Sequence, residues 1–390
     1  MAEEKQTVMP QKKVRCLFVL PSLAGGGAEK VTLTLLKNLD RQKFSPTLLL
    51  FKPEGEFLSD VPNNIPLITA LPIDDKGILS FFKIIHAVRK AAKANDVVVG
   101  ALELQGILCA VIGATLAGRP SIAWVHKHLG TYLGRRTWVS RALYWLVCAL
   151  VFSFPKRIVT VSADAAKSLC SLFFWRRKAI TFHYNPIDFA AIEIEAKQLT
   201  SAYLEQSPPR CVLAVGRLTA QKGFDILIQA MSTVVKVIPN AHLSILGEGE
   251  QRVLLERMIQ DLKLSKNVSL LGFTCPYRAM AATDLFVMSS RYEGLPTVML
   301  EAMYCGAPIL STDCPSGPRE IVEDGRYGVL VPSESPLALS DAIIALLHDR
   351  QRLDELSQLS LSRVKHFAIN DICHAWQQEL LTIQQDKLCT

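Results

Sequence analysis

The stretch CVLAVGRLTAQKGFDILIQAMSTVVKVI, residues 211–238, decides the fold class. It begins with an apolar run at 211–216, passes through a glycine-containing turn, and continues with helical periodicity from about residue 224 to 238. A short buried strand that leads directly into a helix is the repeating unit of parallel sheets covered by helices. The stretch therefore predicts an α/β fold.

The same alternation of apolar runs and helical periodicity extends through the rest of the chain. We expect strands at 14–20, 47–51, 96–102, 121–126, 157–162, 179–184, 211–216, 242–246, 268–272, 284–289, 308–311 and 329–331. Residues 336–385 predict two or three helices and no strand. The two series of strands indicate two doubly wound, Rossmann-like domains with functional loops at an interdomain cleft.

A polar stretch between the two series sets the expected domain boundaries. We expect a disordered tail over 1–13, an N-terminal domain over 14–190, a linker over 191–209, a C-terminal domain over 210–365, and a final helix within 366–390 that packs back on the N-terminal domain.

The composition excludes several classes of protein. With 390 residues, 49% hydrophobic and 20% charged, the chain exceeds one ordinary domain and lacks the composition of a disordered protein. The net charge of +7, without a run of five like charges, predicts no nucleic-acid partner but suits an anionic ligand or a membrane surface. Ten scattered cysteines predict reduced thiols in the cytoplasm, and the histidine and cysteine spacings predict no metal site.

Three consecutive glycines, Gly25 to Gly27, lie between the first expected strand and a helix. Glycines let a backbone approach a ligand closely, and the free amide groups at a helix start favour an anion. Gly26 and Gly27 are therefore candidate ligand-binding residues, and a loose strand-to-helix turn is the alternative.

Arg217 ends an expected strand, and Lys222 lies where the next helix begins. Both cationic groups can converge near the positive end of that helix, which suits a diphosphate leaving group. Two solvated surface charges are the alternative, but an uncompensated lysine in the first helical turn is unfavourable against the helix dipole.

The segment SSRYEGLPTVMLEA, residues 289–302, places Glu293 in a loop and Glu301 in the helix that Pro296 begins. On the second turn of that helix Glu301 can accept two vicinal hydroxyls, as on a ribose, and Glu293 can meet a second hydroxylated ring. A pair of catalytic carboxylates, as in hydrolases, ranks lower because the two nearby cations imply a phosphate leaving group.

These motifs, together with GGGAE at 25–29 and DCPSGPRE at 313–320, resemble glycosyltransferase family 4. Members of this family are retaining, nucleotide-sugar-dependent enzymes of the GT-B fold. The resemblance covers roughly residues 14–385 and is stronger in the second half. It implies an acceptor-binding N-terminal domain and a C-terminal domain that binds the nucleotide sugar.

The resemblance also implies roles for individual residues. The donor diphosphate would be held by Arg217 and Lys222, the ribose by Glu301, and the transferred sugar by Glu293, with His126 close to it; His128 is a weaker candidate. The remaining expected donor-binding residues are Gly294, Leu295, Pro296 and Thr297 at the sugar and distal phosphate, and Gly247, Leu271, Gly272 and Phe273 at the nucleobase. Core packing is the alternative for Leu271 and Phe273. The resemblance favours a UDP sugar carrying a hexose or an N-acetylhexosamine, without a metal or another cofactor, and it identifies no general base.

An uncharged, mostly apolar run at 142–154 lies between basic and aromatic residues. Its thirteen residues are too few for a membrane-spanning helix of about 20, but they suit a helix lying in a lipid headgroup layer. A buried core helix is the alternative. The expected membrane and acceptor residues are Arg135, Arg136, Trp138, Arg141, Trp145, Lys156 and Arg157. The acceptor would then be a polyprenyl-diphosphate-linked sugar or another lipid-linked glycan on the cytosolic face of the membrane.

Three other functions stay open at this point. A nucleotide-sugar 2-epimerase shares the two-domain architecture, and a transferase with a soluble acceptor needs the same donor site. A non-catalytic nucleotide-binding protein is disfavoured, because Arg217, Lys222, Glu293 and Glu301 are all present.

Overall fold

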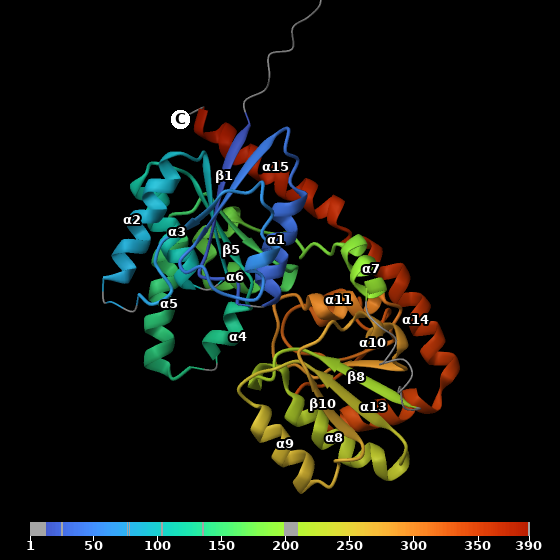
Figure 1. Cartoon of the computed structure of the whole chain (residues 1–390). Helices are drawn as coiled ribbons and strands as arrows, with labels where there is room; N and C mark the ends of the chain where they lie inside the picture. The colour runs from blue at the N-terminus through green and yellow to red at the C-terminus, as the bar shows by residue number, and fades with distance from the viewer. Residues whose placement is uncertain are drawn as a thin grey trace, which may run out of the picture. The chain divides into compact units, whose positions relative to one another are not determined.

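The computed structural model describes residues 13–24, 26–75, 77, 79–102, 104–134, 136–198 and 210–388 (Figure 1). The expected tail, apart from Lys13, and residues 199–209 of the expected linker lie outside this range. The predicted α/β class is confirmed by two sheets of seven and six strands, in which every pairing described here is parallel.

The first sheet has the strand order β3-β2-β1-β4-β5-β6-β7. Its strands are β1 (Val14–Leu20), β2 (Phe44–Leu50), β3 (Leu67–Thr69), β4 (Val97–Leu102), β5 (Ser121–Val125), β6 (Arg157–Thr160) and β7 (Ile180–Phe182). The sequence pattern did not predict β3, because three partly exposed residues at a sheet edge are too few to show a period. The helices before β8 along the chain are α1 (Gly27–Asn38), α2 (Ser80–Lys93), α3 (Leu104–Leu116), α4 (Leu129–Gly134), α5 (Trp138–Ser153), α6 (Ala163–Leu172) and α7 (Phe189–Gln198).

The second sheet has the strand order β10-β9-β8-β11-β12-β13. Its strands are β8 (Cys211–Val215), β9 (His242–Leu246), β10 (Val268–Gly272), β11 (Leu285–Met288), β12 (Ile309–Thr312) and β13 (Val329–Val331). The helices that follow β8 along the chain are α8 (Phe224–Val237), α9 (Arg252–Asp261), α10 (Tyr277–Ala282), α11 (Thr297–Tyr304), α12 (Pro318–Ile321), α13 (Pro336–His348), α14 (Arg350–Val364) and α15 (Ile369–Leu388). Helices α8 and α13 contact each other (Figure 1), and their buried apolar side chains share one core with the strands.

The chain divides into two compact units by its internal contacts. One unit comprises residues 1–125, 145–159 and 373–390, and the other comprises 126–144 and 160–372. Within the first unit, Trp376 of α15 lies against Trp124 of β5 with ring centroids 4.4 Å apart, and Arg157 Nε pairs with Glu379 Oε1 at 2.9 Å. The domain boundaries expected from sequence stay predictions, because most of the expected linker lies outside the described residues.

Candidate donor site

The second sheet has its switch point between β8 and β11. The chain runs outward from β8 through β9 to β10, and then returns to β11 on the other side of β8. Loops that follow two such strands lie side by side, which is where open α/β sheets bind ligands. Among the hydrogen bonds that join these loops, Arg291 N–H donates to the Gln221 carbonyl at 2.8 Å, and Ser289 Oγ donates to the Lys222 carbonyl at 2.9 Å.

Lys222 and Glu293, both predicted site residues, form an ion pair across these loops. The distance from Lys222 Nζ to Glu293 Oε1 is 2.7 Å, and the side chains are 17% and 8% exposed. The stem of Lys222 passes over Gly216, where an added Cβ would lie 3.2 Å from Lys222 Cε. Gly223 turns the chain into α8 at φ 63°, and a Cβ there would lie 2.2 Å from the Ser289 carbonyl oxygen.

The two oxygens of the Glu293 carboxylate differ in how they are used. Oε1 accepts from Lys222 and from Ser290 Oγ, each at 2.7 Å, whereas Oε2 accepts, from the residues that the structure describes, only a long 3.4 Å bond from Gln221 Nε2. Each carboxylate oxygen can accept two hydrogen bonds. Oε2 is therefore the atom of Glu293 with capacity for a further donor, such as a hydroxyl.

Arg217 lies just after β8 and differs from Lys222 in being exposed. Within the described part of the chain, its guanidinium has no hydrogen-bond or ion-pair partner. Its five N–H donors and fixed charge are therefore available to an anion beside Lys222.

Residues 294–297 form a tight loop, called the sugar loop below, that leads into α11. An added Cβ at Gly294 would lie 2.0 Å from the His126 carbonyl oxygen, so only glycine fits against that backbone. Pro296 adopts an extended ψ of 100°, and the helix therefore begins at Thr297 instead of at Pro296. Among the described residues, the backbone N–H groups of Gly294, Leu295 and Thr297 have no acceptor. Glu301 lies buried on the second turn of α11.

The two candidate histidines have different environments. Burial, reinforced by the charge of Lys127, lowers the pKa of His126 to about 3, so its imidazole is neutral near pH 7. His128 Nδ1 accepts a hydrogen bond from the Thr131 N–H at 3.2 Å, close to the start of α4. Since this contact accounts for His128 as a helix cap, the structure gives it no separate catalytic geometry.

The candidate nucleobase residues cluster at the ends of β9 and β10. Gly247 N–H donates to the Gly272 carbonyl at 2.8 Å, and an added Cβ at Gly247 would lie 1.9 Å from the Gly216 carbonyl oxygen. The side chains of Leu271 and Phe273 are 44% and 65% exposed. Core packing, the alternative for these two residues, is therefore wrong.

The glycine-rich loop lies in the other unit of the chain. Gly26 is the buried N-cap residue of α1 and offers no side-chain cap, while Gly27 is exposed at the first helical position. An added Cβ at Gly26 would lie 2.3 Å from Glu29 Oε2, so a larger residue would collide with that side chain. Gly25 lies outside the described residues.

Helix α5 has one buried and one exposed apolar face. Cys148, Val151 and Phe152 are buried, whereas Val139, Leu143, Leu146 and Leu150 are each at least half exposed and recur every three or four residues. The core alternative thus holds for one face only. Trp138 is 80% exposed, Arg141 and Lys156 are also exposed, and Trp145 is half-buried.

The basic residues expected near this helix are partly engaged by the protein itself. The Arg136 guanidinium lies 4.7 and 4.5 Å from the ring centroids of Tyr132 and Tyr144, and Arg157 is paired with Glu379. Arg135 lies outside the described residues. Over the described part of the chain, no helix combines the length and apolarity needed to cross a bilayer.

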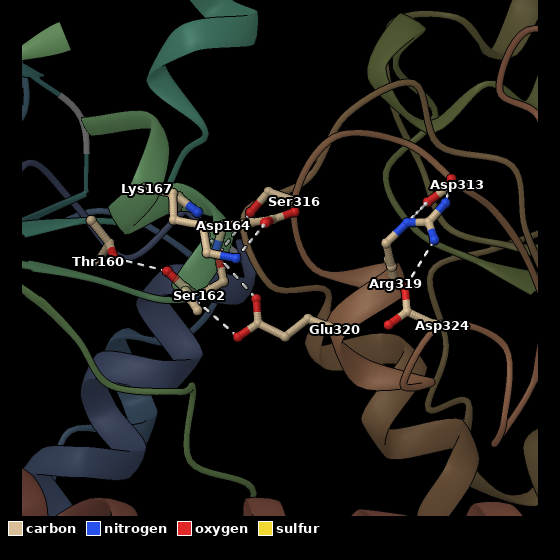
Figure 2. A network of polar contacts seen from close by, with 11 residues as sticks. Thr160, Ser162, Asp164, Lys167, Asp313, Ser316, Arg319, Glu320 and Asp324 are labelled. Atoms are coloured by element: carbon tan, nitrogen blue, oxygen red, sulfur yellow. Dashed lines mark hydrogen bonds and ion pairs between the residues drawn. The ribbon is translucent and has the colours of Figure 1, made fainter. Parts of the chain in front are cut away.

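The motifs did not reveal a polar contact between the start of α6 and the segment 316–320 (Figure 2). Glu320 accepts from the backbone N–H groups of Ala163 and Asp164 at 2.9 and 3.3 Å, and Ser162 Oγ lies 2.7 Å from Ser316 Oγ. Glu320 and Ser316 belong to a quoted motif, but their partners are more than 150 positions away in sequence. Sequence spacing alone carries no signal for such a pairing.

Comparisons with known proteins match both halves of the chain to transferases. The model described as Glycosyltransferase Family 4 matches residues 25–191, and the model described as Glycosyl transferases group 1 matches residues 197–360. An uncharacterized glycosyltransferase of Methanocaldococcus jannaschii is 36% identical over 42% of this chain and 47% of its own length, so that match spans about half of the relative.

Two further matches extend over nearly the whole chain. The N-acetylgalactosamine-N,N'-diacetylbacillosaminyl-diphospho-undecaprenol 4-alpha-N-acetylgalactosaminyltransferase of Campylobacter jejuni is 25% identical over 89% of this chain and 93% of its own. The crystal structure of Anabaena Alr3699/HepE in complex with UDP and glucose is similar in fold, with a TM-score of 0.80 and 21% identity over 95% of this chain and 100% of that one.

The two sheets, their switch-point site and these matches define the class: the chain is a glycosyltransferase of the GT-B fold. It belongs to the family-4 type of these enzymes, as its motifs predicted. Among the described residues, no group of three or more His, Cys, Asp or Glu side chains is arranged to hold a metal ion. The absence of a metal requirement stays a prediction.

Proposed function

We propose that this glycosyltransferase moves a hexose or an N-acetylhexosamine from a UDP sugar to a lipid-linked saccharide or another glycan, with retention of the anomeric configuration. The observation that carries the proposal is the Lys222–Glu293 ion pair, together with the exposed Arg217, which has no partner among the described residues and follows the Gly216 that Lys222 passes over. This arrangement puts two cations and one carboxylate at the switch point, and it suits a diphosphate joined to a hydroxylated sugar.

The two cations would stabilise the leaving group. As the bond to the anomeric carbon breaks, negative charge grows on the diphosphate, and fixed positive groups lower the energy of that state. An ammonium group has three N–H donors, and the Lys222–Glu293 bond uses one, which leaves two for phosphate oxygens. None of the Arg217 donors is used by a residue that the structure describes, and the guanidinium can bind two oxygens at once.

The acidic residues and the sugar loop would hold the two sugars of the donor. Oε2 of Glu293 can accept a hydroxyl of the transferred sugar, while the N–H groups of Gly294, Leu295 and Thr297 can donate to its oxygens and to the distal phosphate. Glu301 would accept the ribose hydroxyls. The neutral imidazole of His126, whose carbonyl oxygen abuts Gly294, fits a position beside the uncharged sugar. No residue of the site is assigned as general base.

A lipid-linked acceptor is favoured by two independent features. The Campylobacter jejuni relative is named for transfer to a diphospho-undecaprenol-linked sugar, and the exposed face of α5 suits a lipid surface. An apolar stripe with the exposed cations Arg141 and Lys156 near its two ends is typical of a helix lying in the headgroup layer of anionic lipids. We therefore place the protein on the cytosolic face of a membrane, where it would meet this acceptor.

The transfer is tested by incubating the protein with a panel of nucleotide sugars and a bacterial membrane lipid extract. Mass spectrometry should find a lipid-linked product that gains one hexose or N-acetylhexosamine, with release of UDP. Conversion of the donor to an epimer without any acceptor would identify a 2-epimerase instead and would contradict the proposal.

Membrane binding is tested by liposome flotation with anionic vesicles. Burying one large apolar side chain completely contributes about 1.5 to 3 kcal/mol. Leu143 and Leu150 are 63% and 58% exposed, so together they would newly bury roughly one such side chain, and replacing both by serine should weaken partitioning by roughly 10- to 100-fold. The matched control is Val253→Ser with Leu254→Ser, which removes two equally exposed apolar side chains from α9. If the Leu143/Leu150 variant floats as well as the control variant, α5 does not bind the membrane.

A further inference from the structure

A chain of buried hydroxyl groups connects the start of α6 to the sugar loop. Ser162 and Ser316 are 0% and 2% exposed, and their Oγ atoms lie 2.7 Å apart (Figure 2). Ser316 Oγ donates to the Gly294 carbonyl at 2.7 Å, and Ser162 Oγ accepts from the Ala165 N–H at 3.2 Å. The chain therefore ends on a backbone atom of the proposed donor site.

The hydrogen count fixes the direction of this chain. A hydroxyl has one hydrogen, and that of Ser316 is given to the Gly294 carbonyl. The hydrogen between the two serines must then come from Ser162, whose oxygen already accepts from the α6 backbone. All bonds point the same way, from the positive end of α6 to the Gly294 carbonyl, so each one polarises the next.

The backbone of Ser316 indicates that its side chain is needed for this purpose. Ser316 adopts φ 68°, a left-handed conformation that glycine adopts freely and serine does not. The next residue, Gly317, also has a positive φ, and an added Cβ there would lie 2.5 Å from Pro296 Cδ. At position 316 the hydroxyl is the one polar group that serine adds to glycine.

Holding the Gly294 carbonyl also sets the direction of the next amide group. The carbonyl of residue 294 and the N–H of residue 295 point to opposite sides of one planar peptide, so Leu295 N–H faces away from Ser316. Two further bonds fix the neighbouring peptides: Glu293 N–H donates to the Pro315 carbonyl at 3.2 Å, and Asn185 Nδ2 donates to the Leu295 carbonyl at 3.0 Å.

We propose that Ser162 and Ser316 are positioning residues that orient the sugar loop so that its free N–H groups face the donor sugar. The inference rests on the proposed function, because the sugar loop is the part of the site assigned to the transferred sugar. Neither serine touches the donor. Their effect is chiefly on the sugar part of the donor, because Arg217, Lys222 and Glu301 would hold most of the nucleotide part.

The sharpest test is Ser316→Gly, because glycine suits the backbone at φ 68° and the variant loses the hydroxyl together with a single carbon, Cβ. We expect kcat/KM for the UDP sugar that the wild-type enzyme consumes to fall about 5- to 20-fold, the usual effect of losing one buried hydrogen bond. The Kd for UDP alone, measured by calorimetry, should stay within about threefold of wild type, because the loop chiefly serves the sugar.

Two further variants serve as controls. Ser162→Ala should likewise lower kcat/KM for the UDP sugar while leaving the Kd for UDP nearly unchanged. Ser162→Thr should restore turnover because it keeps a hydroxyl at an N-cap position. Lys263→Gly, at an exposed residue with φ 57°, repeats the backbone change without touching the chain of hydroxyls and should leave activity unchanged.

The possible results separate this inference from the proposed function. Unchanged turnover in Ser316→Gly beside an active wild-type enzyme refutes the inference alone, as does an equal loss of UDP binding. A wild-type protein that consumes none of the UDP sugars refutes the proposed function, and the inference with it.

Discussion

Replacing Lys222 by methionine removes one charge of the proposed donor clamp while keeping a side chain of similar length. Lys222 would donate to the leaving diphosphate, so its loss should raise the activation barrier by about 2 to 5 kcal/mol, the cost of truncating one partner of a buried charge pair. That range corresponds to a fall in kcat/KM of roughly 30-fold to several thousand-fold. The fall in kcat/KM is measured from the rate at which UDP is released from the preferred donor in the presence of acceptor.

The same substitution should also destabilise the ligand-free protein. Glu293 is 7% exposed and would lose its cation, and breaking such a pair costs about 3 to 5 kcal/mol when nothing replaces the partner. Since Ser290 and Gln221 still donate to Glu293, we expect the lower end of this range, a decrease of about 3 kcal/mol in the free energy of unfolding measured in urea.

Arg217→Gln is the comparison that isolates the catalytic effect. Arg217 is exposed and unpartnered among the described residues, so its replacement should change stability by less than about 0.5 kcal/mol and still lower turnover by a similar factor. Full activity in Lys222→Met or in Arg217→Gln would refute the reasoning. Equal destabilisation by both variants would show that the assigned environments are wrong.

Three further predictions follow from single contacts. Burial lowers the pKa of His126 to about 3 from a usual 6.5, so the unfolded chain binds a proton that the folded chain does not, and folding stability is lost as the pH falls below 6.5. Between pH 7.5 and 5, the free energy of unfolding of His126→Asn, measured in urea, should therefore fall by about 2 kcal/mol less than that of the wild type. Equal losses in the two proteins would contradict the burial of His126. Gly294→Ala should lower donor turnover at least about tenfold, because its Cβ would lie 2.0 Å from the His126 carbonyl oxygen. The control variant Gly134→Ala has open space around its Cβ and should be as active as the wild type. Trp376→Ala should lower the free energy of unfolding in urea by about 3 to 5 kcal/mol, because Trp376 is fully buried against Trp124. A decrease below about 1 kcal/mol would show that this packing is dispensable.

The fold was predictable because strands and helices leave local periodic patterns. The strands that form the middle of each sheet are buried runs of Val, Ile and Leu, and their pattern marked them in the sequence. Edges and ends were less predictable. β3 is too short to show a period, and the start of α11 is set by the extended backbone of Pro296, which the sequence pattern placed inside the helix.

The site was predictable where its residues lie in one motif, and not where distant segments meet. Lys222 and Glu293 belong to two separate sequence motifs. The switch point of the second sheet brings Lys222 Nζ to within 2.7 Å of Glu293 Oε1. Ser162, Asn185 and Ser316 contact each other or the sugar loop over more than 100 positions of sequence, which no spacing reveals. The exposed face of α5 likewise depends on which side of the helix the fold covers, because a helix that is apolar all round has no polar stripe to mark its outer face.

The most direct test of the central claim is an experimental structure of the protein with UDP bound. The account predicts diphosphate oxygens within hydrogen-bond distance of both Arg217 and Lys222, with the ribose hydroxyls on Glu301. A diphosphate bound elsewhere in the C-terminal half, with Lys222 still paired to Glu293 and Arg217 still without a partner, would contradict it.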